Sequence, residues 1–206
     1  MILKPQDTLL VLKYWSIRGQ GLNELKVKPI HLIGSIDPGP GEFNKKPSVR
    51  QLAESIKVSP GEVSKSTKRL VAAKLLVDRN AEYFVERRAL QEWLCYGVRH
   101  AYPVESNGFG RGMPTAWNCP RVRTDILPPD PPVVWPVSGG TVEGTMIKPI
   151  HDSVPFAASN DELLYEALSL VDAIRLGKPR ELAVARDELA ITLESYRNHW
   201  SDTTKI

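Results

Sequence analysis

The sequence is poor in the features that mark disulfide-stabilised, secreted and membrane-spanning proteins. Its 206 residues include 2 cysteines, and Cys95 and Cys119 are too few to form a disulfide framework. No apolar run approaches the roughly 20 residues that span a bilayer. A signal peptide is not recognisable either, because Asp7 interrupts the apolar run after Lys4. We therefore expect a soluble, cytoplasmic protein without a membrane partner.

Recognisable catalytic signatures are also lacking. The four histidines stand apart from one another, without the carboxylate or cysteine spacings of metal sites. The glycine-rich SGGTVEGT segment that begins at Ser138 has no following lysine and helix, so it differs from a phosphate-binding loop. The acidic residues between Asp161 and Glu188 have the helical spacing of surface ion pairs. The sequence thus predicts no enzyme, no metal and no cofactor.

The net charge is small but unevenly distributed. It is +3 for the whole chain. Residues 45–79 hold nine Lys or Arg against three Asp or Glu, whereas the residues from Phe156 onward hold nine acidic and six basic side chains. A basic N-terminal half with an acidic C-terminal half indicates one surface for nucleic acid and a different surface for another role.

Residues 47–85 contain the clearest pattern, two short helices followed by two short strands. Ser48 and Gln51 form the S-x-x-Q pattern of a helix start. Ser59 and Glu62 repeat this capping box, with Pro60 at the first helical position. The first helix has one apolar stripe at helical spacing, made of Val49, Leu52, Ala53 and Ile56. Two capped helices so close together must cross, as in a helix-turn-helix.

The second helix divides into an apolar and a cationic face at 3.6 residues per turn. The inward side is predicted to hold Val63, Thr67, Leu70 and Val71. The outward side is predicted to hold Gly61, Ser64, Lys65, Lys68, Arg69 and Ala72. A face with small residues between cations can approach a polyanion closely, since lysine and arginine meet phosphates or guanine edges. A solvated helix face is the alternative interpretation of the same charges.

The pattern resembles a known family of regulators. Strands at Leu75–Val77 and Tyr83–Val85, with a turn at Asp78–Ala81, resemble the two-stranded wing of winged helix-turn-helix regulators. The N-terminal LKPQDTLLVLKYW resembles their first helix, much as in MarR-like proteins. One departure is the connection from Arg18 to Pro47, which is far longer than such a connection usually is.

The resemblance implies that the helix at residues 60–74 enters the major groove of double-stranded DNA, with Ser64, Lys65 and Lys68 nearest the base edges. The other DNA-binding residues are then Gly61 on the same face, Ser59, Arg69, Lys45 and Lys46 at phosphates, and Arg79 at the tip of the wing.

Three further segments follow the strands. Arg87 to Tyr102 predicts a helix with an apolar stripe, which either pairs with a second copy of the chain or packs on its own domain. Pro103 to Pro155 holds more than half of the 17 prolines and predicts an ordered, extended segment that wraps over a surface, with SNGFGRG at Ser106–Gly112 as a flexible stretch.

The C-terminal part predicts a helical hairpin that begins with a third capping box at Ser159 and Glu162. Gly177 ends the first of its two helices and Pro179 begins the second. Such a hairpin suits an effector module, a dimerisation unit or a dock for another protein.

The sequence therefore predicts a mostly helical α+β protein in three parts: a winged helix-turn-helix at residues 1–102, an extended segment at 103–155 and a helical hairpin at 156–206. The predicted function is that of a DNA-binding transcriptional regulator, acting as a homodimeric repressor. The alternative is a protein-interaction module of antitoxin type, which restrains a partner protein through its C-terminal half and autoregulates through its winged helix.

Overall fold

The computed structural model describes residues 2–20, 47–80, 82–122, 124–177 and 179–195. Within them the fold is α+β and mostly helical, as the sequence predicts. In chain order the elements are α1 (Pro5–Gln20), α2 (Val49–Ser55), α3 (Pro60–Ala72), β1 (Leu76–Arg79), β2 (Glu82–Val85), α4 (Arg87–Glu92), the π-helical η2 (Trp93–Gly97), α5 (Val98–Ala101), β3 (Ser106–Pro114), the 3-10 helix η3 (Ala116–Asn118), β4 (Val133–Pro136), β5 (Val142–Ile147), α6 (Val154–Ser159), α7 (Glu162–Leu176) and α8 (Pro179–Ser195). Lys45, Lys46 and nearly all of Arg18 to Pro47 lie outside the described residues.

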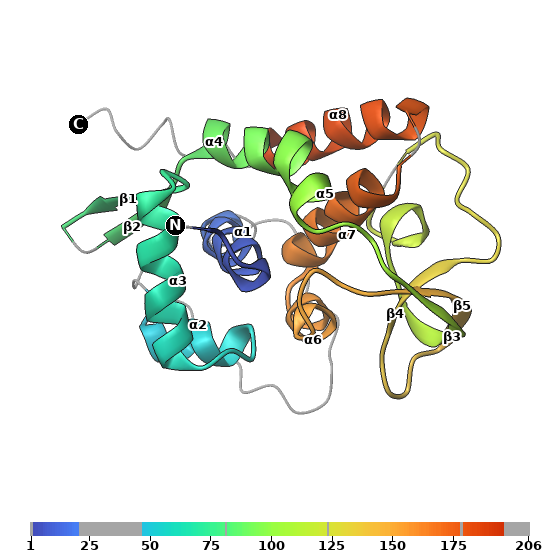
Figure 1. Cartoon of the computed structure of the whole chain (residues 1–206), viewed down its shortest axis with the longest axis horizontal. Coiled ribbons are helices and arrows are strands. Elements are labelled where there is room, and N and C mark those ends of the chain that lie inside the picture. Colours follow the sequence, from blue (N-terminus) through green and yellow to red (C-terminus); the bar gives the residue numbers. More distant parts are fainter. Residues whose placement is uncertain (1, 21–46, 81, 123, 178, 196–206) are drawn as a thin grey trace.

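The two β structures lie at opposite ends of the molecule (Figure 1). Helices α1 and α7 pack on each other between the β1–β2 hairpin and the β3–β5 sheet (Figure 1). The buried apolar side chains form one continuous cluster that extends from α1 through α7 to α8. The predicted boundaries at residues 102 and 155 therefore do not separate independent hydrophobic cores.

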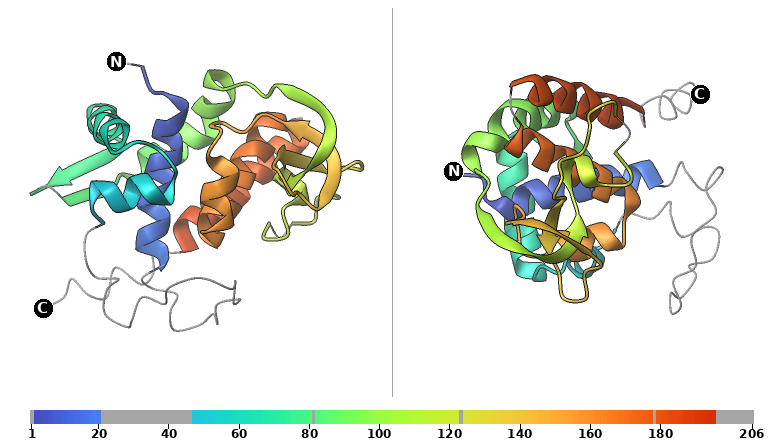
Figure 2. Two further views of the ribbon diagram at one scale, coloured as in Figure 1. Left: turned by 90° about the horizontal axis from the view of Figure 1, so that it is seen from below. Right: turned by 90° about the vertical axis from the view of Figure 1, so that its right-hand side faces the viewer.

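Helices α2 and α3 confirm the predicted pair of capped helices. Ser48 makes the full capping box, since its hydroxyl accepts from the Gln51 backbone N–H and its own N–H donates to the Gln51 side chain. In the left view of Figure 2, α3 is seen nearly end-on while α2 lies in the plane of the picture, so the two helices cross steeply. The predicted stripe of α2 was wrong at Val49, which is 43% exposed.

The second capping box is present only in part. Ser59 accepts a hydrogen bond from the backbone N–H of Glu62 at 3.3 Å. The Glu62 carboxylate does not return to the cap residue, because it accepts hydrogen bonds from Arg69 and Gln6 instead. The start of α3 is thus capped from one side, and the acidic residue of the box serves a tertiary contact.

The β1–β2 hairpin is antiparallel, and its turn is shorter than predicted. Asp78 and Arg79 continue β1 and pair with Tyr83 and Glu82. The turn begins at Asn80, whose φ of +56° is a left-handed conformation that asparagine tolerates better than most residues.

The helix predicted from Arg87 to Tyr102 is confirmed as α4, η2 and α5 in succession. Most of its apolar stripe is covered by this chain: Leu90, Leu94 and Val98 are fully buried, and α4 contacts α8 while α5 contacts α7. Of the two predicted uses of the stripe, packing on its own domain is the one observed. In the π-helical segment, the Cys95 carbonyl accepts a hydrogen bond from Nε of Arg186 at 2.8 Å.

The segment from Pro103 to Pro155 is more regular than predicted. Strands β3, β4 and β5 each pair with both of the others and close into a small barrel. The stretch expected to be flexible, Ser106–Gly112, forms most of β3. Closure brings backbones so near that a Cβ on Gly112 would lie 2.0 Å from the carbonyl oxygen of Trp135. Only glycine fits there.

The predicted helical hairpin is confirmed as α7 and α8, but its start was wrong. Ser159 ends a separate short helix, α6, and its hydroxyl donates to the Phe156 carbonyl. Asp161 is the cap residue of α7, and its carboxylate accepts from the Leu164 N–H at 3.0 Å. Asp161 also forms an ion pair with Lys13 of α1 at 2.7 Å, which fastens α7 to the N-terminal part of the fold.

Candidate nucleic-acid interface

Helix α3 presents the outward face that the sequence predicts, with one exception. The exposed residues of α3 include Gly61, Ser64, Lys65, Lys68 and Ala72, and the cap residue Ser59 is exposed as well. On the opposite side Val63 and Leu70 are completely buried and Thr67 is 6% exposed. The apolar side chains hold the helix against the core, so the cationic side is left facing water.

The two lysines of this face have no counter-charge among the residues that the structure describes. Within the part of the chain that the structure describes, neither Lys65 nor Lys68 forms an ion pair with a carboxylate. Beside Lys68 on the helix surface, the Ser64 hydroxyl donates to the Pro60 carbonyl at 3.1 Å, which leaves its oxygen free to accept. The face therefore offers two cationic donors and one neutral acceptor, with glycine and alanine giving room for close approach.

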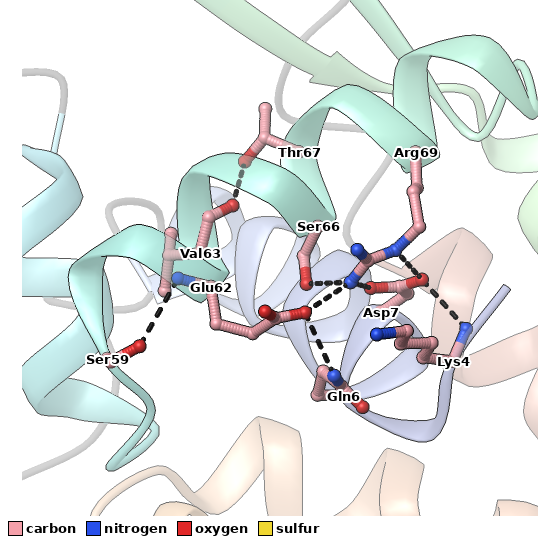
Figure 3. Close-up of polar contacts among 9 residues, drawn as sticks. All are labelled: Lys4, Gln6, Asp7, Ser59, Glu62, Val63, Ser66, Thr67 and Arg69. Atoms are coloured by element: carbon pink, nitrogen blue, oxygen red, sulfur yellow. Dashed lines mark hydrogen bonds and ion pairs between the residues drawn. The ribbon is translucent and has the colours of Figure 1, made fainter.

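Arg69 is the exception, and its predicted place on the outward face was wrong. Its guanidinium turns toward α1, where Nε donates to Oδ2 of Asp7 at 2.8 Å and Nη2 donates to Oδ1 at 2.7 Å (Figure 3). The same Nη2 donates to Glu62 at 2.6 Å and to Ser66 at 2.9 Å. With 11% of its side chain exposed, Arg69 is committed to internal partners and is not available as the predicted phosphate anchor.

The partners of Arg69 are themselves held in place. The Asp7 carboxylate is completely buried and also accepts from the backbone N–H of Lys4 at 2.8 Å. Gln6 donates to the Glu62 carboxylate at 3.0 Å (Figure 3). We refer to Gln6, Asp7, Glu62, Ser66 and Arg69 as the α1–α3 clamp. The clamp joins the first turn of α1 to α3 at Glu62 and at Arg69, which lie about two turns apart.

Hydrogen bonding in the clamp favours the charged forms of Glu62 and Arg69. The hydrogen bond from Arg69, and next that from Gln6, hold the pKa of Glu62 below its usual value. The hydrogen bond to Asp7 raises the pKa of Arg69 further above its already high value. Both groups therefore stay ionised at neutral pH, and the Glu62 charge is directed at Arg69 on the flank of α3.

The hairpin is positioned beside α3 through Tyr14 of α1. Its hydroxyl lies 3.4 Å from the hydroxyl of Thr67, and its ring meets the ring of Tyr83 edge-on at 6.0 Å. Burial raises the pKa of Tyr14. Arg79, at the end of β1, is exposed and stacks over the Phe84 ring at 5.0 Å. The hairpin thus carries a cation at its tip, as predicted.

Sequence reasoning missed the members of the clamp on α1 and the burial of Ser66. In the sequence, Asp7 stood out only as the residue that interrupts an apolar run, and 62 residues separate it from Arg69. No local pattern reports such a partner. A weak signal was available on α3 itself, because Glu62, Ser66 and Arg69 recur at helical spacing beside the cationic face.

Two acidic residues predicted as surface ion pairs are buried instead. Asp161 is 3% exposed and Asp172 is 2% exposed. Asp172 accepts hydrogen bonds from Thr115, Trp135 and Arg175, and burial raises the pKa of its carboxyl. These carboxylates connect α7 to α1 and to the barrel, so they belong to the interior of the fold.

The described residues contain no group of three His, Cys, Asp or Glu side chains that could hold a metal ion. In the same residues, every helix is too short or too polar to cross a membrane. Comparisons with protein-family models, curated proteins and solved structures gave no match.

Proposed function

We propose that this protein is a winged helix-turn-helix regulator that binds double-stranded DNA through α3, with the β1–β2 hairpin as its wing. The observation that carries the proposal is the outward face of α3, where Lys65 and Lys68 lie exposed without a carboxylate partner in the described chain. The hairpin beside it adds the exposed Arg79.

The chemistry of this face fits the major groove. An α-helix fits into that groove, where guanine presents two acceptors and where cytosine and adenine present amino donors. Lys65 and Lys68 supply donors to guanine or to phosphate, and the oxygen of Ser64 accepts from an amino group. Gly61 adds no side chain to the face, so the backbone of the first turn can come close to the DNA.

Binding should depend on these lysines and on salt. In a mobility-shift titration at low salt, the full chain should bind a duplex that covers the region upstream of its own coding sequence. The variant Lys65→Ala with Lys68→Ala should lose this binding, and the salt dependence of any residual affinity should be shallower by about two units of slope.

The matched control is Lys148→Ala with Arg180→Ala, which removes the same charge from an exposed pair with Glu105 and from the first turn of α8. The control should bind DNA like the unmodified protein. Equal losses in both variants would mean that net charge, and not α3, governs binding. The absence of any shift at low salt would contradict the proposal.

The regulator is proposed to act in the cytoplasm as a repressor, since occupying a promoter requires nothing beyond binding. A homodimer stays a prediction. The helix formed by α4, η2 and α5 already buries most of its apolar stripe within the chain, so a dimer needs a different surface. Light scattering in solution, with and without DNA, measures the oligomeric state directly.

The alternative function, a protein-interaction module, is less well supported, because it needs exposed apolar side chains in the proline-rich segment. Although Phe109 and Leu127 of the proline-rich segment are exposed, its large apolar residues Trp117, Val134 and Trp135 are buried in this chain. They are therefore not exposed for contact with a partner protein.

A further inference from the structure

We propose that Arg69 is a positioning residue for DNA reading, which fixes the rotation of α3 on α1 and keeps the Glu62 carboxylate away from the DNA-facing side. This inference rests on the proposed function. It assigns to the α1–α3 clamp a role in affinity that is separate from its contribution to folding.

The geometry of the clamp restrains rotation because its contacts are paired. Arg69 binds both carboxylate oxygens of Asp7, which fixes the plane of the guanidinium as well as its distance. Asp7 cannot follow a moving α3, since it is completely buried and held by the Lys4 backbone. Turning α3 about its axis would therefore break two charge-assisted hydrogen bonds together.

A second attachment lies about two turns closer to the start of α3. Gln6 of α1 donates to Glu62, which also accepts from Arg69. The clamp thus holds α3 at Glu62 and at Arg69, seven positions apart. Lys65 lies between these positions in the sequence, so the clamp brackets the part of α3 that is proposed to read bases.

The clamp also decides where a negative charge lies. At 3.6 residues per turn, Glu62 lies on the flank of α3 next to Lys65. A carboxylate released from this flank could reach toward the phosphates that Lys65 is proposed to meet, and it would repel them. Arg69 and Gln6 hold it on the side of α1. A rotated helix would both misalign the lysines and bring this charge toward the DNA.

A double variant tests the clamp without changing the net charge. Asp7→Asn with Arg69→Gln removes one charge of each sign and replaces the ion pair by neutral amides. The control, Lys13→Gln with Asp161→Asn, breaks a buried ion pair that also involves α1 and leaves α3 untouched. Both variants are expected to unfold at lower temperature, and DNA affinity is measured where circular dichroism shows each one folded.

The clamp variant should bind the upstream duplex roughly tenfold more weakly, the scale of one misaligned base contact. Its discrimination against a scrambled duplex should fall by a similar factor. Its salt slope should stay unchanged, because Lys65 and Lys68 are retained. The control should keep the affinity of the unmodified protein despite its lower stability. Glu62→Gln, a milder change at a partly exposed residue, should weaken discrimination less than the double variant.

Hydrogen exchange provides a readout without DNA. Backbone amides of α3 should exchange faster in the clamp variant than in the control, whose loss should fall on α1 and α7. If the unmodified protein binds DNA and the clamp variant binds equally well, the clamp is structural only and the inference is overturned. If the unmodified protein binds no duplex, the proposed function fails first, so the two failures are distinguishable.

Discussion

Helices α3 and α7 are of similar length, 13 and 15 residues, yet their charged side chains lie in opposite environments. In α7, Asp172 and Arg175 are each 2% exposed at the side chain and pair with each other. In α3, Lys65 and Lys68 are exposed and have no carboxylate partner in the described chain. A buried, paired charge specifies how elements pack, whereas an unpaired charge in water remains available for a ligand.

Arg69 shows what lies between these extremes. It belongs to the helix proposed to face DNA, but its guanidinium is used for packing, as that of Arg175 is. Residue type and position on a helix therefore do not by themselves separate a ligand-binding cation from a structural one. The two kinds of cation differ in whether an acidic partner lies within hydrogen-bonding distance.

The largest effect is expected in α7. Arg175→Met should lower the free energy of unfolding by about 3–5 kcal/mol, because it leaves Asp172 buried without its cation and removes donors to the carbonyls of Tyr102 and Lys148. Urea denaturation measures the loss. Arg88→Ala, which removes an exposed arginine from an ion pair with Glu92, should change stability by no more than about 0.5 kcal/mol. Similar losses in the two variants would contradict the contrast drawn between buried and exposed charge.

The next effect concerns the barrel on which α7 packs. Gly112→Ala should destabilise the protein by at least about 1–3 kcal/mol, because the added methyl group meets the backbone of β4 at Trp135 and cannot be moved aside. Thermal unfolding followed by circular dichroism measures this. An unchanged melting temperature would show that the three strands are packed less closely than described.

A glycine of α3 should respond with the opposite sign. A Cβ on Gly61 would meet no atom within 4 Å, so Gly61→Ala should stabilise the helix by about 0.5–1 kcal/mol. The same methyl group would lie on the outward face and should weaken DNA binding. A variant that melts higher and binds less tightly supports the assignment of this face. A more stable variant with unchanged affinity would place Gly61 outside the interface.

The smallest effect is a pH dependence at the clamp. The pKa of Glu62 is lowered in the folded state by the hydrogen bond from Arg69. The stability from this contact is therefore fully present above the unfolded pKa of about 4.3 and is lost as pH falls through the lower folded value. The stability difference between the unmodified protein and Glu62→Gln should shrink below about pH 4, as urea midpoints measured from pH 7 to pH 3 would show. A constant difference would mean that Glu62 gains nothing from Arg69.

Much of the N-terminal fold followed from local patterns. Ser48, Ser59 and Pro60 predicted the starts of α2 and α3, and the structure confirms both. The barrel was not predicted, since β3 consists largely of glycine and polar residues that locally resemble a flexible loop. Its order comes from pairing with β4 and β5, which are distant in the chain.

The sequence by itself determined which side of α3 faces water, because helical periodicity and capping depend on residues at most a few positions apart. Tertiary structure decided the roles of the charges. The partners of Arg69, Lys13 and Arg175 include atoms 62, 148 and 73 residues away in the chain. The strength of an ion pair depends on distance and burial in three dimensions, and neither can be read from a local pattern.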